Sequence, residues 1–113
     1  MNTKNGLVIE MAEGKVKEGV DPQEYLKASD NIMADLRGLE GYVRRELWQG
    51  EDGRFVDIVY WESLEKAQRA AEIFPTLPGA QPLEALLDFS SLSMRHLQQV
   101  RVYYGVEGAY GKD

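Results

Sequence analysis

The order of strand-like and helix-like segments constrains the fold of this chain more than any other feature. Strands are expected over residues 7–11, 42–48, 55–61 and 92–106, where large apolar side chains alternate with others, and the first of them is open to extension through Val16. Helices are expected over residues 22–37 and 63–74, where apolar residues recur every three or four positions. The chain therefore reads as two consecutive strand–helix–strand halves.

The first helix has a well-defined start and end in the sequence. Asp21 can cap the helix, Pro22 suits its first position, and Glu24 stands where a capping-box carboxylate reaches back. Gly38 and Gly41 bracket the exit. We therefore expect one continuous helix from Pro22 to Arg37.

The second helix is expected to begin after a cap at Ser63 and to end before Pro75. Its apolar side carries mostly alanine, so the helix either approaches the sheet closely or leaves room beneath it. An irregular connection with three prolines follows, and after it a short helical turn is expected over residues 83–87.

The two middle strands predict a β-hairpin because a glycine-containing turn separates them. If the turn centres between Glu51 and Asp52, one face carries Val43, Leu47, Val56, Ile58 and Tyr60. The other face then carries Tyr42, Arg44, Glu46, Trp48, Phe55, Asp57, Val59 and Trp61. A register shift of one residue would exchange these sets, and the sequence leaves that choice open.

Right-handed crossovers place both helices on one face of a four-stranded antiparallel sheet, which is the ferredoxin-like α+β arrangement. The other face of the sheet is then bare in a single copy. Large apolar residues occur at both parities of the strands, so we expect a second copy to cover this face in a homodimer.

The length of 113 residues predicts one domain over residues 1–113, with residues 105–113 as a loose, glycine-rich tail. The absence of cysteine excludes disulfides and thiolate chemistry and suggests the cytoplasm. No stretch approaches the roughly 20 apolar residues that span a bilayer. We therefore expect no membrane partner.

The charge pattern and the motif content exclude several function classes. The net charge is −6, and Arg44 and Arg45 are the only adjacent basic residues, so nucleic acid is not an expected partner. No dinucleotide fingerprint or phosphate loop is present, and a single histidine falls short of the several converging ligands that a metal site normally needs. The sequence predicts a chain without a cofactor or a metal.

His96, the only histidine, is the first candidate for a functional site. On the last strand it shares a face with Gln98, in a row that otherwise contains Leu92, Met94, Val100, Val102, Tyr104 and Val106. A polar group in such a row needs a partner, whether protein, solvent or ligand. One interpretation is a histidine satisfied in a core or an interface, and the other is a base in a lined pocket.

Other residues are candidates for supporting roles at such a pocket. Glu10 and Glu13 are alternative bases, and Arg44 or Arg45 can stabilise an anion unless it pairs with Glu46 or Asp57 across the hairpin. Substrate-binding candidates are Gln98, Trp61, Tyr60, Met11 and Met33. The methionines and aromatic residues also suit an ordinary core.

Two stretches of the chain resemble a known superfamily. Residues 55–67, FVDIVYWESLEKA, resemble the third strand and second helix of dimeric α+β barrel proteins, and especially of antibiotic biosynthesis monooxygenase-like domains. Gly38-Leu39-Glu40-Gly41-Tyr42 is similar to the turn that leads into the second strand of that group. The resemblance implies a dimeric barrel whose ligand lies between sheet and helices.

The resemblance also narrows the possible activities. The haem-degrading branch has an asparagine on the first strand, where this chain has Met11, Ala12 and Glu13, and a haem-ligating histidine just after the second helix, where this chain has none. The expected function is a cofactor-independent monooxygenase-like enzyme, a metal-free oxygenase or isomerase, that acts on a small aromatic or apolar organic compound with His96 as acid/base. The alternative is a non-catalytic ligand-binding or stress-associated dimer.

Overall fold

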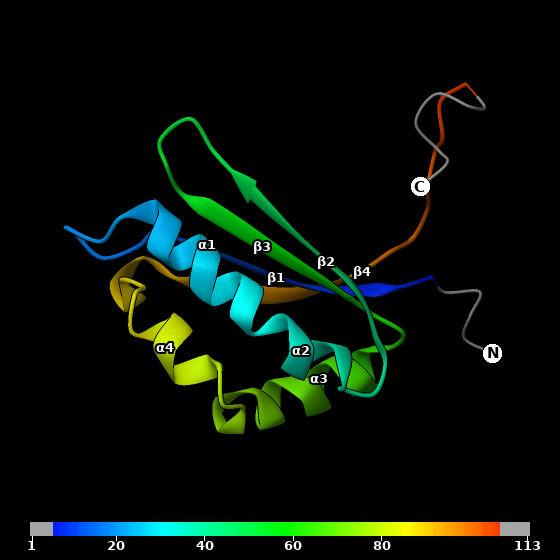
Figure 1. Cartoon of the computed structure of the whole chain (residues 1–113). Coiled ribbons are helices and arrows are strands. Elements are labelled where there is room, and N and C mark those ends of the chain that lie inside the picture. The colour runs from blue at the N-terminus through cyan, green and yellow to red at the C-terminus, as the bar shows by residue number, and fades with distance from the viewer. Residues whose placement is uncertain (1–5, 107–113) are drawn as a thin grey trace.

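The structure is a computed structural model that describes residues 6–106, and it consists of an antiparallel sheet with helices on one face (Figure 1). The strands are β1 (Val8–Gly14), β2 (Tyr42–Gln49), β3 (Phe55–Trp61) and β4 (Ser93–Gln98), in the order β2-β3-β1-β4. The α-helices are α1 (Pro22–Asn31), α2 (Met33–Arg37), α3 (Leu64–Ile73) and α4 (Ala80–Glu84). This arrangement confirms the predicted ferredoxin-like α+β fold. Within the described residues, no helix is both long enough and apolar enough to span a bilayer.

The first helix is interrupted where the sequence predicts continuity. Its start is as expected, since Asp21 and Glu24 form a complete capping box. Ile32, however, ends α1 and precedes α2. The carbonyl of Ser29 accepts a hydrogen bond from Arg45 Nη1 at 3.2 Å. A side-chain donor thus satisfies a helical carbonyl next to the interruption. The periodicity of the helix sequence cannot reveal this donor, because it comes from β2.

The hairpin forms as predicted, but its register differs by one residue from the expected centre. Gln49 pairs with Phe55, and Arg45 pairs with Val59. A five-residue turn, residues 50–54, separates the strands, with Gly53 at a φ of +88°. The shift exchanges the β2 residues from Arg44 onward between the two faces of the sheet, whereas Tyr42, on the other side of an irregularity in the pairing, lies opposite Trp61 as expected.

We call the side that faces the helices the inner face and the opposite side the outer face. On the hairpin, Arg45 and Leu47 share the inner face with Phe55, Asp57, Val59 and Trp61, whereas Arg44, Glu46 and Trp48 share the outer face with Val56, Ile58 and Tyr60. On β1, Val8, Glu10, Ala12 and Gly14 point inward.

The last strand is much shorter than the predicted segment 92–106. Pairing with β1 ends where Gln98 meets Val8, and the Gln99 amide makes one further bond to the Leu7 carbonyl at 2.8 Å. Since β1 begins at Val8, no strand within residues 6–106 continues the pairing beyond residue 99. They leave the sheet (Figure 1), and Val100 is 83% exposed. Of the predicted tail, residues 107–113 lie outside the described residues.

The second half of the chain follows the prediction more closely. The Ser63 hydroxyl caps α3 by accepting from the Lys66 amide at 3.2 Å, and a 3-10 turn, Phe74–Thr76, ends the helix. The short helix in the proline-rich connection lies earlier than expected, at Ala80–Glu84. The first strand ends at Gly14, later than Met11, and Val16 makes an isolated bridge to Leu87.

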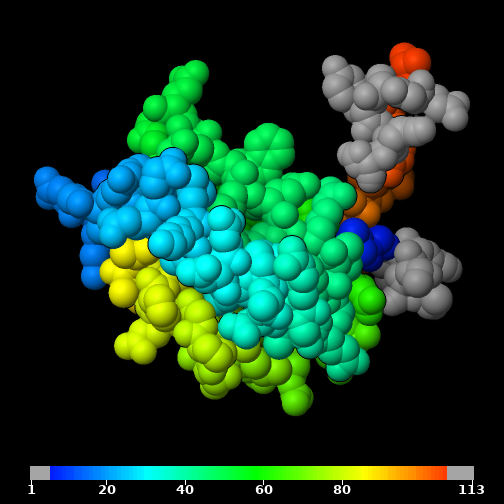
Figure 2. All heavy atoms as spheres, in the orientation of Figure 1, coloured from blue at the N-terminus to red at the C-terminus, as the bar shows by residue number. Residues whose placement is uncertain are grey.

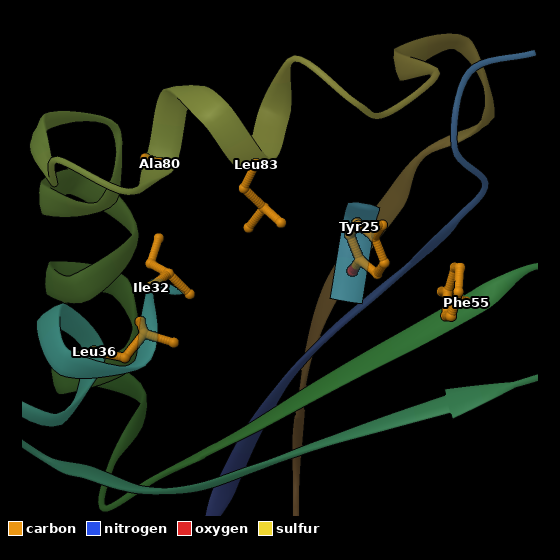
Figure 3. Close-up of a cluster of buried hydrophobic side chains, with 6 residues drawn as sticks. All are labelled: Tyr25, Ile32, Leu36, Phe55, Ala80 and Leu83. Carbon is orange, nitrogen blue, oxygen red and sulfur yellow. The ribbon is translucent and has the colours of Figure 1, made fainter. Parts of the chain in front are cut away.

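The core divides into two clusters along the inner face. The first joins the α1–α2 region, β3 and α4, through Tyr25, Ile32, Leu36, Phe55, Ala80 and Leu83 (Figure 3). The second packs Ala67 and Ala70 of α3 on Val8, Val59 and Trp61. From the side of the helices, Figure 2 shows α1 and α2 in blue and cyan next to the yellow and green of α4 and α3.

Candidate functional site

A cavity of about 330 Å³ lies between the inner face of the sheet and the helices. Most of its wall is apolar, with side chains from β1, β3, α1, α2, α3 and the connection to β4. Polar groups on the wall are Glu10, Glu13, Arg45, Asp57, Tyr25 and Glu84. Such a volume and such a wall are typical of a site for a small organic ligand.

Small residues leave the space for this cavity. Ala67 is fully buried against the sheet, whereas Ala70 and Ala71, one turn further along α3, line the cavity. Ala12 and Gly14 line it from β1. The alanine-rich side of α3 therefore combines the two arrangements that the sequence left open. It packs closely on the sheet at Ala67 and leaves space beneath the helix at Ala70 and Ala71.

Glu10 and His96 form an acid–imidazole pair at the edge of the cavity. They are direct partners in the β1–β4 ladder, and Glu10 Oε2 lies 3.3 Å from His96 Nε2. The two atoms are within ion-pair distance but outside hydrogen-bond geometry, and Nε2 is shielded from solvent. Burial raises the pKa of Glu10, the charge of His96 lowers it, and the charge of Asp57 raises it again, with a net increase.

Arg45 and Asp57 form a second pair beside the first. Asp57 Oδ1 accepts from Arg45 Nε at 3.0 Å and Oδ2 accepts from Nη2 at 2.8 Å, while Nη1 donates to the Ser29 carbonyl and to Met33 Sδ. Burial alone would lower the pKa of Arg45, but the bonds to Asp57 outweigh it and the pKa is raised. The guanidinium therefore stays charged and joins β2, β3 and the end of α1.

Tyr25 and Trp61 contribute further polar atoms to the wall of the cavity. Burial, together with the charge of Asp57, raises the pKa of Tyr25 to about 12, so the phenol stays neutral at physiological pH. Trp61 is 2% exposed, and among the described residues its Nε1 has no hydrogen-bond partner. A buried indole N–H without a partner is a donor available to a ligand that reaches it.

The structure brings only part of the predicted site together. His96 lies on the inner face beside Glu10, and Trp61 lines the cavity. Gln98 is exposed at the end of β4, and Met33 packs on the first core cluster and on Arg45. Tyr60 and Met11 lie on the outer face, away from the cavity. Both arginines weighed as anion ligands have carboxylate partners, since Arg44 also lies 3.0 Å from Glu46.

Sequence reasoning missed Asp57 and Tyr25 as site residues. Asp57 interrupts the apolar row of Phe55, Val59 and Trp61, which is the same signal that identified His96. The assumed hairpin register placed Arg45 on the other face, although the sequence did name Asp57 as a possible partner of an arginine across the hairpin, and the structure shows this pair. Tyr25 follows the helix start and has no distinguishing pattern in the sequence.

The raised pKa of Glu10 predicts a pH-dependent effect of Glu10→Gln on stability. A carboxyl whose folded pKa exceeds 4.5 contributes stability below pH 4.5 and loses it as the pH rises through the folded value. Glutamine does not ionise, so the variant does not lose stability in this way. Its free energy of unfolding, measured relative to wild type, should therefore be higher at pH 7 than at pH 4. Urea titrations at both pH values measure the difference, with Glu51→Gln in the exposed turn as control. A difference that does not change with pH would contradict the prediction.

Comparisons with known proteins identify the fold. No family model and no curated protein matches the chain. A variant of SnoaB, a cofactor-independent oxygenase from Streptomyces nogalater, superposes with a TM-score of 0.70 at 21% identity, over 85% of this chain and 95% of that one. A protein from Nitrosomonas europaea, provisionally assigned as an antibiotic biosynthesis monooxygenase, has a TM-score of 0.68 at 13% identity, over 85% and 92%.

A third solved structure is described as a dimeric ferredoxin-like protein from an uncultured marine organism. It has a TM-score of 0.66 at 13% identity, over 92% of this chain and 96% of that one. These similarities confirm the resemblance drawn from the sequence at the level of the fold. The chain has the ferredoxin-like α+β fold that these solved structures share.

Proposed function

We propose that this chain is a cofactor-independent monooxygenase-like enzyme that acts on a small aromatic compound bound in the cavity. The observation that carries the proposal is the Glu10–His96 pair at the wall of a largely apolar space of about 330 Å³. A base beside an apolar cavity can remove a proton from an acidic C–H or O–H group of an aromatic substrate. The fold shared with a cofactor-independent oxygenase supports the same class of activity.

The reaction needs only the substrate and dioxygen. The base takes a proton from a ring-activated CH₂ group, and the C–H electron pair stays on the substrate as a delocalised anion. This anion reduces O₂ and forms a C–O bond to give a peroxide anion, to which the base returns the proton. Loss of the second C–H proton with cleavage of the O–O bond leaves a carbonyl group and water. The balance is R₂CH₂ + O₂ → R₂C=O + H₂O.

The position of Trp61 favours a substrate that carries an oxygen atom able to accept a hydrogen bond. The shielded indole N–H can donate to a ligand carbonyl or phenolate oxygen, and such a bond would also hold the anion formed by proton removal. Arg45 and Asp57 lie on the same wall as an ion pair, which supplies hydrogen-bonding groups but no net charge. Of the predicted substrate-binding residues, Trp61 is therefore the one that the proposal retains.

The proposed enzyme is a homodimer that associates through the outer face. Ile9, Met11, Val56, Ile58 and Leu97 give this face an apolar centre, and Trp48, 60% exposed, lies at its edge. No helix covers this face in the part of the chain that the structure describes (Figure 1). An extended apolar surface of this kind is typical of a protein interface.

Anthrone tests the proposed activity because its CH₂ group lies between two aromatic rings and a carbonyl group. We expect the protein to accelerate conversion of anthrone to anthraquinone with uptake of one O₂ per product, measured by absorbance and an oxygen electrode. His96→Ala should lower turnover by at least about 100-fold, the usual contribution of a general acid or base, while the dimer stays intact. Full activity in His96→Ala would contradict the role of the pair.

The alternative function is a non-catalytic ligand-binding dimer of the same fold. It predicts that apolar and aromatic compounds bind in the cavity and leave unchanged. Calorimetry would measure the binding of anthrone and of other phenolic and ketonic aromatic compounds. If these compounds bind and no oxygen is consumed, the ligand-binding function is favoured over the enzyme.

A further inference from the structure

We infer that the Glu10 carboxylate accepts the substrate proton at the cavity wall. His96 is then a positioning residue that lies on the far side of Glu10 from the cavity and shares this proton with it. The inference rests on the proposed function and assigns separate roles within its acid–base pair. It departs from the expectation that the histidine itself faces the substrate.

The geometry places the two residues in series. Glu10 is part of the cavity wall, and His96 is not. Because the two residues are direct ladder partners, the imidazole lies at the side of Glu10 toward the β4 edge of the sheet. Its Nε2 atom is shielded and lies 3.3 Å from the carboxylate, while 25% of the side chain is exposed. The carboxyl group therefore lies between the cavity and the imidazole.

The surroundings of Glu10 favour a shared proton. Asp57, from β3, faces Glu10 as a like charge, but both of its oxygens are bonded to Arg45 from β2. The other titratable residues that line the cavity are Tyr25 of α1, Glu84 of α4 and Glu13 of β1, whose carboxylate lies 3.6 Å from Arg54. His96 is thus the group within 4 Å of Glu10, among those described, that can accept a proton from it.

The proton transfer is a closed cycle. Glu10 accepts the substrate proton and passes it to His96 Nε2, which leaves a carboxylate beside an imidazolium. The opposite charges stabilise each other in a site of low dielectric constant. The same proton returns through Glu10 to the peroxide anion, so the pair ends each turnover in its starting state.

Carbon-13 NMR of the Glu10 side-chain carboxyl tests the pairing in the ligand-free protein. In wild type we expect two inflections with pH, because two interacting groups titrate in coupled steps. In His96→Gln we expect one inflection, at a higher pH than the first wild-type step, because the imidazolium charge that lowers the pKa of Glu10 is gone. Arg95→Gln, which removes a cation from the outer face of the same strand, should leave the curve unchanged.

The pH dependence of anthrone turnover supplies a second readout with the opposite sign. The base acts once the pair has lost its shared proton, and a lone carboxyl loses its proton at a lower pH than a carboxylate–imidazole pair. The acid limb of the pH profile of kcat/KM should therefore move to lower pH in His96→Gln. In the NMR titration of the same variant, the inflection of the Glu10 carboxyl should move to higher pH. A structural role for His96 would lower activity without this pair of opposite shifts.

The two measurements separate the possible failures. A single wild-type inflection, unchanged in His96→Gln, overturns the inference even if anthrone is converted. Wild-type protein that converts none of the aromatic compounds overturns the proposed function, and the carboxyl titration then decides the pairing alone. If His96→Gln does not fold, the number of inflections in wild type remains the deciding observation.

Discussion

Replacement of Arg45 by methionine should lower the free energy of unfolding by about 3–5 kcal/mol, the usual cost of removing one partner of a buried ion pair. The Arg45 side chain is 5% exposed and that of Asp57 is 22% exposed, so solvent screens the pair only weakly. The variant leaves Asp57 without its partner and the Ser29 carbonyl without its side-chain donor. Urea denaturation followed by circular dichroism measures the loss.

Two further variants show whether the loss comes from the unpaired carboxylate. Arg44→Met removes the neighbouring arginine, which is 54% exposed on the outer face, and should cost less than about 1 kcal/mol. Arg45→Met combined with Asp57→Leu removes both charges and should recover much of the lost stability. Equal losses in Arg44→Met and Arg45→Met would contradict the special role of the inner pair.

Ile58→Asp should convert the proposed dimer to monomers, with an increase in the dimer Kd of about 100-fold or more. Ile58 lies on the outer face at the middle of the sheet, opposite Met11 on β1 and Glu46 on β2. In a two-fold interface each copy would place an unpaired carboxylate in an apolar contact. Sedimentation velocity at micromolar concentration measures the change.

Leu64→Asp is the matched control for that experiment. It makes the same kind of change at a residue that is 46% exposed, at the first position of α3 on the other side of the sheet. An acidic residue in the first turn of a helix is tolerated, so the association state should not change. A monomeric wild-type protein, or a dimer unaffected by Ile58→Asp, would rule out the outer face as the interface.

The elements of the fold could be predicted because their signals are local. The capping box at Asp21, the Ser63 cap and the glycine turn of the hairpin are each complete within a few residues, and each forms as expected. The element order then left few arrangements that right-handed crossovers allow. Two features depend on partners that are distant in sequence. Arg45 bonds to a carbonyl beside the interruption between α1 and α2, and the first residue of β1 sets where the pairing of β4 ends.

The candidate site was harder to predict than the fold because strand register decides it. A shift of one residue moved Arg45 to the inner face and Arg44 to the outer face, although the two are adjacent in sequence. The pairing of His96 with Glu10 likewise depends on how β4 aligns with β1, nearly ninety positions earlier in the chain. A polar residue in an apolar row identified His96 as a candidate, but only the ladder supplied its partner.

The alanines that line the cavity separate ligand size from reactivity. Ala12, Ala70 and Ala71 set how much room the chamber has, and none of them carries a polar side chain. Larger apolar side chains at these positions would exclude bulkier compounds and leave the ionisable groups in place. In this scaffold, selectivity for molecular dimensions can therefore change independently of acid–base strength.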